Sequence, residues 1–549
     1  MTPRPVAVFV GPELEDNLAI RTLASSVRAA GMPASFVRFN TRDEVSTVVA
    51  DLLASAPALV GLSMAFQHRA PEFLALAAAL RGRGYDGHIC AGGHVATVMP
   101  DEVLAAGSPI DTALGHEGED SIVRLLRVLD DRRAWNDVPG LAWRDETGTI
   151  RRNPPAPACR DLDSLPLPAR DRPLRRHLGL PFVPLAGSRG CYGSCRFCAV
   201  STFHQLRPGP RLRYRSPEHV AREMAALYHD HGARIFCFHD ETLFLPKPAQ
   251  TRRRLDEISD HLRRLGVGRI AVVGKARPDA IEPGLLSHLR ESFGLMRLYV
   301  GIENWSAAGL EHLGRGITAD VAAAALTACR ATGVYGCYNL LLFEPDGTLE
   351  DVEENLRGME RFSDVPVNFC RAEAYAGTPL WMDLQQAGRL RTDGFATDYT
   401  IADPRAQRLF KIARQVFRDR NFAPDGLGNV VMSLGYERQL LLHFLPGPDP
   451  RADELVHEAD ELSAAIGRDT RRHLAEAIRF VRTAEHPSAT AVAEFTFELA
   501  TSVNLSGTPL LERLLDLRQE MTRYAETRSA FGATAALETS AQPTQGGMP

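Results

Sequence analysis

The sequence predicts an α/β protein in three parts: a doubly wound domain, a partial (β/α)6 barrel and a mainly helical C-terminal region. Two observations favour this class. Short apolar runs alternate with stretches of helical spacing in two separate parts of the chain, which is typical of parallel sheets covered by helices. At 549 residues, the chain is also long enough for three or four domains of ~150 residues each.

The first part contains five strand-like runs separated by helical stretches and glycine-rich turns. Residues 14–30 illustrate the pattern, because their helical spacing stops at Gly31. Ligands of doubly wound units bind beyond the carboxyl ends of the strands, so the turns at those ends are candidate binding residues. The predicted strands are residues 6–10, 34–39, 59–64, 88–91 and 112–114.

A second series of six strand-like runs begins at Phe182, after a polar, proline-rich stretch that predicts an ordered linker. In barrels, catalytic groups lie on loops at the carboxyl ends of the strands. The predicted strands are residues 182–185, 234–238, 269–273, 296–301, 336–343 and 368–374. The predicted domains are the doubly wound domain at 1–135, the linker at 136–180, the barrel at 181–384, the helical region at 385–528, with helices at 453–467 and 470–483, and a disordered tail at 529–549.

The composition argues against several classes of protein. Lys plus Arg total 63 and Asp plus Glu total 68, and the resulting formal charge of −5 argues against general nucleic-acid binding. The longest apolar runs are too short to cross a bilayer, and the N-terminus lacks a basic stretch followed by an apolar one. Nine cysteines without such a signal predict a cytoplasmic protein, in which thiols serve as ligands more readily than as disulfides.

Three cysteines stand close together directly after the first barrel strand. Cys191, Cys195 and Cys198 are spaced C-x3-C-x2-C in a glycine-rich loop. An electron-transfer iron–sulfur cluster usually has four cysteine ligands, so a cluster held by these three keeps one iron open, as catalytic metal sites do. The alternatives are a zinc site with a distant fourth ligand and cysteines without a ligand role. The lack of a second cysteine pair favours the cluster over zinc.

This motif, with Phe197 as its aromatic residue, resembles the signature of the radical S-adenosylmethionine (SAM) superfamily. The resemblance implies a [4Fe–4S] cluster on the three cysteines, with SAM chelated to the open iron through its amino and carboxylate groups. It also implies that one electron from the reduced cluster cleaves SAM to methionine and a 5′-deoxyadenosyl radical. An external donor such as flavodoxin or ferredoxin would supply that electron.

Three later strand ends resemble SAM-binding segments of the same superfamily. Asp240 and Glu241 stand where family members contact the methionine amino group, and a carboxylate there would make a charge-assisted hydrogen bond. Arg277 lies in a segment similar to the R-x-D of the family, and Glu303 lies in one similar to its GIES segment. The resemblance therefore implies that these four residues and Phe197 bind SAM.

Two departures from the family pattern concern the same region. Asn304 replaces the usual serine, and residues 342–348 stand where many members have G-x-P-G-E-T. A structural alternative exists for each of the acids as well. Asp279, for example, can cap a helix that begins near Ile281.

The first domain resembles the flavodoxin/Rossmann-like cobalamin-binding domain of cobalamin-dependent radical SAM enzymes, methyltransferases among them. Residues 92–97 and 115–119 are similar to the GGxxxT and GEGE turns of that class, and glycines at strand ends let the backbone approach a corrin ring. The D-x-H-x-x-G motif of proteins that ligate cobalt through histidine is absent, which implies base-off cobalamin. An alternative is another cofactor, or none, in the same fold. The residues assigned to cobalamin are Pro12, Ser63, Gln67, His68, Gly92, Gly93, His94, Thr97, Glu117 and Gly118, with Gln67 and His68 as the polar candidates facing cobalt.

The leading functional hypothesis is C-methylation of a small molecule, such as an antibiotic precursor. One SAM would methylate cob(I)alamin, a second would yield the radical that removes a substrate hydrogen, and the substrate radical would take the methyl group from methylcobalamin. No side chain need act as an acid or base in such chemistry. The alternatives are a radical ring closure or rearrangement with the same cofactors, and a cobalamin-dependent sensor without catalysis.

The helical region after Leu384 is expected to cover the barrel mouth and supply the substrate pocket. Its possible substrate contacts, which are equally explained as solvated surface groups, are Arg405, Tyr436, Arg438 and His443.

Overall fold

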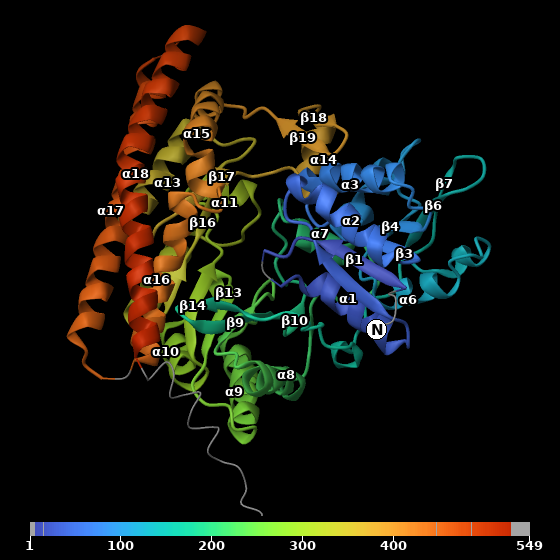
Figure 1. The fold of residues 1–549 in the computed structure, drawn as a ribbon. Coiled ribbons are helices and arrows are strands. Elements are labelled where there is room, and N and C mark those ends of the chain that lie inside the picture. Colours follow the sequence, from blue (N-terminus) through green and yellow to red (C-terminus); the bar gives the residue numbers. More distant parts are fainter. Residues whose placement is uncertain (1–5, 15, 446, 485, 529–549) are drawn as a thin grey trace, which may run out of the picture. The chain divides into compact units, whose positions relative to one another are not determined.

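A computed structural model describes residues 6–14, 16–445, 447–484 and 486–528, and the predicted tail at 529–549 lies outside them. The chain forms two compact units, each assembled from several stretches of sequence, which Figure 1 colours along the chain. Unit 1 comprises Met1–Pro173, Pro184–His219 and Glu373–Tyr399. Unit 2 comprises Leu174–Val183, Val220–Ala372 and Thr400–Pro549.

Unit 1 is built on a seven-stranded sheet in the order β2-β1-β3-β4-β5-β6-β7. The order 2-1-3-4-5 is that of a flavodoxin-like doubly wound sheet, with its topological switch point between β1 and β3. The five parallel strands, all predicted from the sequence, are β1 (Ala7–Gly11), β2 (Ala34–Arg38), β3 (Leu59–Ser63), β4 (His88–Gly92) and β5 (Thr112–Leu114).

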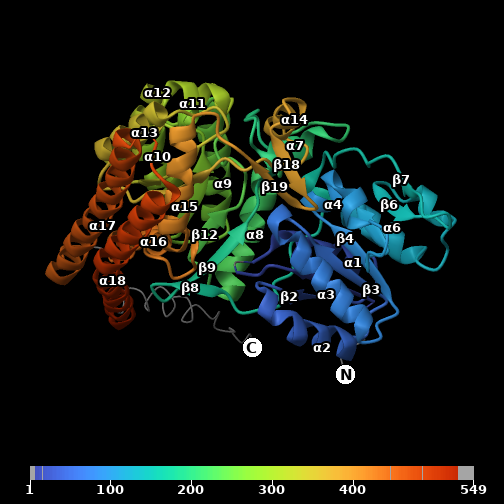
Figure 2. The same cartoon turned by 90° about the horizontal axis from the view of Figure 1, so that it is seen from above.

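Four helices cover the two faces of this sheet: α1 (Leu18–Ala29), α2 (Val45–Ser55), α3 (Ala70–Gly82) and α6 (Glu119–Arg127). Val8 and Val10 of β1 pack in a core with α2 and α3, and Ala7 and Phe9 pack in a second core with α1 and α6. Strand side chains alternate between the two faces of a sheet. The continuous apolar run of β1 is therefore explained by helices on both faces, which Figure 2 shows.

Two short strands, β6 (Leu141–Arg144) and β7 (Ile150–Arg152), extend the sheet in antiparallel fashion beyond β5. They lie in the stretch that the sequence analysis expects to be a linker. Their apolar runs are short and are flanked by prolines and charged residues, so they give no strand signal of their own. Strand β6 pairs with the edge of β5, where Thr112 lies opposite Trp143, and β7 pairs in turn with β6.

A glycine holds the turn after β4 against the turn after β3. Gly93 has a φ of 89°, and a Cβ at this position would lie 3.2 Å from the backbone of Met64. The N–H of Val95 donates to the Met64 carbonyl at 3.0 Å. The short helix α4 (His94–Val98) therefore starts directly at the carboxyl edge of the sheet.

Unit 2 contains the barrel strands, in a six-stranded sheet of order β15-β14-β13-β12-β9-β8 and a two-stranded sheet of β16 and β17. A parallel bridge between Glu303 and Leu340 links the end of β14 to β16, which completes the predicted partial barrel. The strands are β8 (Arg175–His177), β9 (Leu180–Leu185), β12 (Ile235–Phe238), β13 (Ala271–Ala276), β14 (Leu295–Val300), β15 (Tyr335–Cys337), β16 (Asn339–Phe343) and β17 (Asn368–Arg371).

The sequence analysis predicts one strand where β15 and β16 stand, and the structure breaks it at Tyr338. The Tyr338 ring is buried edge-on against Trp305, with ring centroids 5.8 Å apart, at the point where the chain changes sheets. Helices connect the successive strands on one side of the barrel sheet: α8 (Pro217–His231), α9 (Pro248–Arg264), α10 (Pro283–Ser292), α12 (Ala319–Thr332) and α13 (Leu349–Arg361).

Four long helices form the C-terminal part of unit 2: α15 (Pro404–Phe422), α16 (Leu427–Phe444), α17 (Pro450–Thr483) and α18 (Ala489–Thr527). Helices α16, α17 and α18 share one core with the barrel sheet, in which Val431 and Leu434 of α16 lie in the same cluster as Ile235, Val273 and Met296. Among the described residues, none of the helices is both long and apolar enough to span a bilayer.

The two helices predicted at 453–467 and 470–483 form the single helix α17. Gly467, which the sequence analysis takes as a helix end, is buried instead, and a Cβ there would lie 3.0 Å from the Ser363 carbonyl. This glycine permits close packing and does not terminate the helix. Residues 384–399, by contrast, contain an unpredicted hairpin of β18 (Leu390–Asp393) and β19 (Ala396–Tyr399), which belongs to unit 1.

Replacement of Gly358 by alanine tests the packing of α13. Its Cβ would lie 2.2 Å from Cγ of Trp305, whose buried ring is stacked on Phe362 at 5.4 Å and packs edge-on against Tyr338 at 5.8 Å. We expect a loss of about 1–3 kcal/mol in the free energy of unfolding, measured by urea denaturation. The matched control is Gly284→Ala in the first turn of α10, where nothing lies within 4 Å; equal stability of the two variants would contradict this account.

Candidate functional site

The three motif cysteines lie on a loop that a two-stranded ribbon closes. The ribbon pairs β10 (Ser188–Arg189) with β11 (Arg213–Tyr214) in antiparallel fashion. Residues 190–212, hereafter the cysteine loop, run between these strands and contain helix α7 (Ala199–Gln205). Gly190 has a φ of 92°, and a Cβ there would lie 1.7 Å from the Arg211 carbonyl. A side chain at this position would open the neck of the loop.

The sulfur atoms of the cysteine loop lie within electrostatic reach of one another. Burial raises the pKa of the Cys198 thiol, and the neighbouring Cys195 and Cys191 raise it further, whereas backbone N–H groups at the start of α7 lower it. The N–H of Gly193 donates to the sulfur of Cys191 at 3.3 Å. Cys195 is buried and the other two cysteines are half-buried.

This arrangement fits a [4Fe–4S] cluster. Each thiolate of such a cluster binds a different iron, so the three sulfurs need only surround a common volume. A single metal ion makes the stricter demand that its ligands meet at one point, and no three His, Cys, Asp or Glu side chains of the described residues do so. Phe197 is half-buried between the second and third cysteines.

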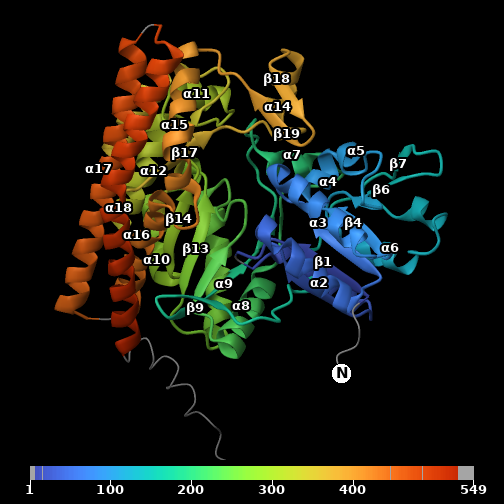
Figure 3. The same cartoon turned by 45° about the horizontal axis from the view of Figure 1, so that its top comes forward.

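The cysteine loop packs against the turns after β4 and β5 through one aromatic side chain. Phe203 on α7 is stacked on His94 at 5.5 Å and lies 5.7 Å from His116, measured between ring centroids. Thr97 links the same two turns, because its hydroxyl donates to the Gly93 carbonyl at 2.9 Å and accepts the His116 N–H at 2.8 Å. Figure 3 shows α7 beside α4.

Two ring nitrogens at this place have no hydrogen-bond partner in the described part of the chain. They are Nε2 of His94 and Nδ1 of His116, and both are buried. Burial lowers the pKa of His94 to about 4, so the ring is neutral at pH 7. Buried polar atoms without a partner are costly in a protein interior, and a cofactor with many amide groups, such as cobalamin, is suited to bind them. His116 lies in the predicted turn at residues 115–119 but is not among the residues assigned to cobalamin; its left-handed φ of 64° is not visible in the sequence.

The turn after β5 carries Glu117, whose carboxylate lies among three arginines. Arg207 and Arg213 each donate to Oε1 at 2.6 Å, and Arg189 lies 3.5 Å from Oε2. Burial opposes ionisation of Glu117, but hydrogen bonds from Arg213 and Arg207 hold the pKa of this carboxyl well below its usual range. Glu119 pairs with Arg189 at 2.6 Å.

The loop after β3 places its two polar candidates differently. The side-chain amide of Gln67 donates to the Phe395 carbonyl at 2.8 Å and accepts the Ala376 N–H at 2.9 Å, so both of its polar atoms bind the segment that returns to unit 1. His68 is exposed beside the exposed ring of Phe66. Of this pair, only His68 presents its side chain to solvent.

The remaining cobalamin candidates lie at the carboxyl edge of the same sheet. Pro12 follows β1, and its carbonyl accepts the amide of Asn17 at 3.0 Å. Ser63 and Gly92 are the last residues of β3 and β4, and Gly118 precedes α6.

Unit 2 carries the other SAM candidates at successive strand ends. Asp240 is buried directly after β12, and Glu241 follows it. After β14, Glu303 has a φ of 67°; burial raises the pKa of its carboxyl, and the charges of Arg315 and Arg277 oppose that rise. The structure thus brings Glu303 and Arg277 together.

Arg315 is a third residue of this group that the sequence analysis missed. Its guanidinium donates to the Gly301 carbonyl, and its own carbonyl accepts from Arg277 at 2.8 Å. Arg315 follows α11 (Ala307–His312) and lies in no motif that identifies it. Asp279 pairs with Arg277 at 3.0 Å, and Glu282 is the N-cap of α10, so Asp279 does not cap that helix.

The departure at Asn304 has a structural explanation. Its side chain donates to the Leu341 carbonyl at 3.1 Å and accepts from the Ser306 N–H and the Asn355 amide, each at 2.8 Å. Asn304 therefore ties the end of β14 to β16 and α13. Glu344, in the second departure, is buried and accepts from His312 at 2.8 Å.

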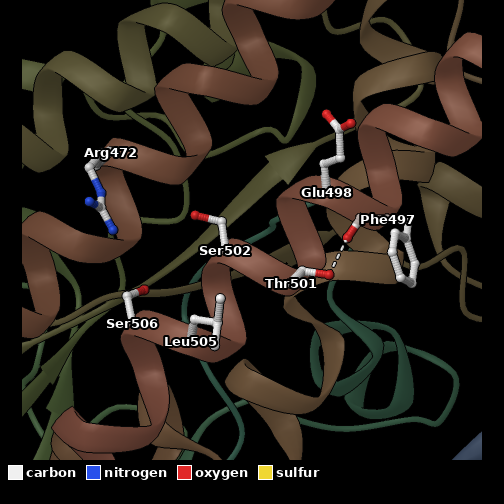
Figure 4. Close-up of a pocket in the computed structure, with 7 residues that line it drawn as sticks. All are labelled: Arg472, Phe497, Glu498, Thr501, Ser502, Leu505 and Ser506. Carbon is white, nitrogen blue, oxygen red and sulfur yellow. Dashed lines mark hydrogen bonds between the residues drawn. The ribbon is translucent and has the colours of Figure 1, made fainter.

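The possible substrate contacts of the helical region lie within unit 2. Tyr436 lies within the core of unit 2, and His443 bonds the Ile270 carbonyl at 2.9 Å. Arg405 and Arg438 form ion pairs with carboxylates of unit 2. An open pocket of about 550 Å³ lies between α17 and α18, lined by Arg472, Phe497 and Ser502 among others, and it contains none of the predicted site residues (Figure 4).

Two family models match the chain. The Radical SAM superfamily model matches residues 185–357, and the B12 binding domain model matches residues 6–126. The first match contains the cysteine loop and the strand ends of the barrel. The second contains the sheet of unit 1 from β1 to β5.

Two curated relatives align with parts of the chain. An uncharacterized methyltransferase, PH0819, from Pyrococcus horikoshii is 29% identical over 316 residues, which are 57% of this chain and 66% of the relative. An anaerobic magnesium-protoporphyrin IX monomethyl ester cyclase from Synechocystis sp. is 28% identical over 229 residues, which are 41% of this chain and 44% of the relative. The chain thus spans less than two thirds of the length of either protein.

A solved structure shares the fold over most of the chain. It is that of the cobalamin-dependent S-adenosylmethionine radical enzyme OxsB with aqua-cobalamin and SAM bound, with a TM-score of 0.67 and 16% identity over 95% of this chain and 84% of that chain. Because this one chain carries both matched domains, it belongs to the cobalamin-dependent radical SAM enzymes, whose cofactors are a [4Fe–4S] cluster, SAM and cobalamin.

Proposed function

We propose that this enzyme transfers a methyl group to a carbon atom of a small molecule, such as a specialised metabolite. The proposal rests chiefly on Phe203, which packs the cysteine loop on the turns that carry His94 and His116. Candidate residues for the cluster and for cobalamin therefore belong to one compact unit. The relative from Pyrococcus horikoshii, which is named a methyltransferase, supports the same reaction class.

Each cofactor has a candidate set of residues in this proposal. Cys191, Cys195 and Cys198 hold the cluster, and the turns around His94 and Thr97 bind cobalamin. When bound, the reduced cluster supplies the electron that cleaves SAM, and cobalamin carries the methyl group. The residues proposed to bind SAM are Phe197, Asp240, Glu241, Arg277, Glu303 and Arg315.

The role of the side chains is to bind and orient the cofactors and to exclude water from them. The N–H groups at the start of α7 stabilise negative charge on Cys198, and the burial of Cys195 keeps water from its sulfur. The neutral ring of His94 offers a hydrogen-bonding nitrogen without adding charge. Arg277 and Arg315 place positive charge beside the buried carboxyl of Glu303. No acid–base pair is required, because the cofactors carry out the bond-making chemistry.

A radical ring closure with the same cofactors is a second candidate function. The observation that favours it is the similarity to the cyclase from Synechocystis. The reactions differ in their products, because methyl transfer consumes SAM both as methyl donor and as radical source. Per methyl group transferred, two SAM and two electrons give one S-adenosylhomocysteine, one methionine and one 5′-deoxyadenosine. A flavodoxin or ferredoxin is the proposed source of these electrons.

The product ratio distinguishes the two candidates. We expect the protein, reconstituted anaerobically with iron, sulfide and hydroxocobalamin, to form S-adenosylhomocysteine and 5′-deoxyadenosine in equal amounts with a true substrate. Mass spectrometry of the nucleosides and of the methylated product measures this ratio. Omission of cobalamin is the control, and it should abolish methylation. Formation of 5′-deoxyadenosine with a modified substrate but no S-adenosylhomocysteine would favour ring closure.

Replacement of Cys195 by alanine tests the assignment of the cluster ligands. We expect this variant to lose reductive SAM cleavage, measured as 5′-deoxyadenosine formed with dithionite, and to bind hydroxocobalamin as before. The control is Cys159→Ser, a half-buried cysteine of unit 1 outside the motif. If the Cys195→Ala protein still formed 5′-deoxyadenosine, the ligand assignment would be wrong.

A further inference from the structure

The neck of the cysteine loop places two positive charges opposite each other. In the β10–β11 ribbon, Arg189 is the cross-strand partner of Arg213. Like charges at directly opposed positions of antiparallel strands destabilise the pairing. The ribbon has only two residue pairs, so it has few other interactions to offset this repulsion. An anion between the two guanidinium groups would offset this repulsion.

Glu117 supplies that anion. Arg213 binds its carboxylate with both terminal nitrogens, at 2.6 Å to Oε1 and 3.0 Å to Oε2, and Arg189 lies 3.5 Å from Oε2. A bidentate pair of this kind fixes direction as well as distance. The side chains of Glu117 and Arg213 are 11% and 3% exposed, so solvent screens their attraction only weakly.

The same carboxylate also binds the cysteine loop on the other side of the motif. Arg207, two residues after α7, donates to Oε1 of Glu117 at 2.6 Å, and its side chain is 2% exposed. Arg189 precedes Cys191, whereas Arg207 and Arg213 follow Cys198, so the arginines bracket the motif. Glu117 thus fastens both ends of the cysteine loop to the turn after β5.

We infer that Glu117 is a positioning residue for the cluster-binding loop. The family resemblance assigns this turn to cobalamin, but both oxygens of the carboxylate bind arginines of the loop and its neck. Removal of the negative charge would take from Arg207 and Arg213 the carboxylate that they share, whereas Arg189 would keep its ion pair with Glu119. The neck would then open, and the three cysteines would lose their common orientation. The part of this inference that concerns the cluster rests on the proposed function.

The test compares Glu117→Gln with Asp120→Asn in the full-length protein. Both changes remove one negative charge, and Asp120 lies three residues after Glu117 in the first turn of α6, where it is exposed and pairs with Arg124. Hydrogen–deuterium exchange of residues 190–212, without any cofactor, reports the loop directly. We expect faster exchange in Glu117→Gln than in Asp120→Asn, with unchanged exchange in β1 and β3.

A second readout follows the cluster after anaerobic reconstitution with iron and sulfide. Residues that orient metal ligands typically change metal affinity ~10–100-fold, so we expect an iron chelator to remove the cluster from Glu117→Gln correspondingly more readily. Hydroxocobalamin affinity, followed by absorbance, should stay within about twofold of Asp120→Asn, since the lost interactions lie on the cysteine loop. Glu117→Asp, which restores the charge, should recover part of the cluster stability. Arg207→Gln removes the ion pair of Arg207 with Glu117 and leaves the bidentate pair with Arg213, so it should show a smaller change in the same direction.

The outcomes separate this inference from the proposed function. Equal exchange of the loop in Glu117→Gln and Asp120→Asn overturns the inference, whether or not a cluster forms. Loss of cobalamin binding with an unchanged cluster also overturns it and returns Glu117 to the cobalamin site. If the unaltered protein holds no cluster but the exchange difference is present, the positioning role stands and the proposed function fails.

Discussion

Both units depend on one constraint: parallel strands end at a common edge of their sheet, and the loops at the carboxyl edge are where doubly wound sheets and barrels bind their ligands. In unit 1, the turns after β3, β4 and β5 meet at this edge. In unit 2, the acids and arginines after β12, β13 and β14 do so. Apolar residues buried on both faces leave no other place for polar chemistry.

The cysteine loop adds a second requirement to this scheme. Three thiolates need a loop that is both tightly folded and partly buried, but a short loop cannot build a core of its own. Here an aromatic side chain of α7 and a carboxylate of the turn after β5 together hold the loop in its folded position. Phe203 fills the space between His94 and His116, and Glu117 holds the surrounding arginines. Apolar packing and ion pairing thereby fix the loop at separate points.

Much of this arrangement is predictable from local sequence patterns. The five strands of unit 1 and the barrel strands are apolar runs bounded by glycine or by polar residues, and their periodicity is a local property. Elements that depend on a distant partner were not predictable. Strand β6 pairs with the edge of β5 and β7 pairs with β6, and the break at Tyr338 depends on its contact with Trp305. Gly467 is typical of a helix end in sequence but is required by a neighbouring carbonyl.

The same distinction applies to the site. The spacing of Cys191, Cys195 and Cys198 is a local signal, and in the structure Cys191 and Cys195 lie close enough to Cys198 to raise the pKa of its thiol. Arg315 carries no such signal, because hydrogen bonds with backbone groups decide its placement. His116 lies in the predicted turn at residues 115–119, but its φ of 64° depends on the fold. Gln67 shows the opposite case. It is a predicted cobalamin residue, but its side-chain amide forms hydrogen bonds with backbone groups of the chain itself.

That last contact has a consequence for how the protein is made. The loop after β3 is synthesised early, but the backbone groups that form hydrogen bonds with Gln67 belong to residues more than 300 positions later. Native contacts between such distant residues form late, because loop closure must precede them. During translation, the contacts of Gln67 with Ala376 and Phe395 therefore form only after the ribosome has synthesised nearly three quarters of the polypeptide. Truncated messages or early nonsense codons would release a first domain that lacks its own last segment.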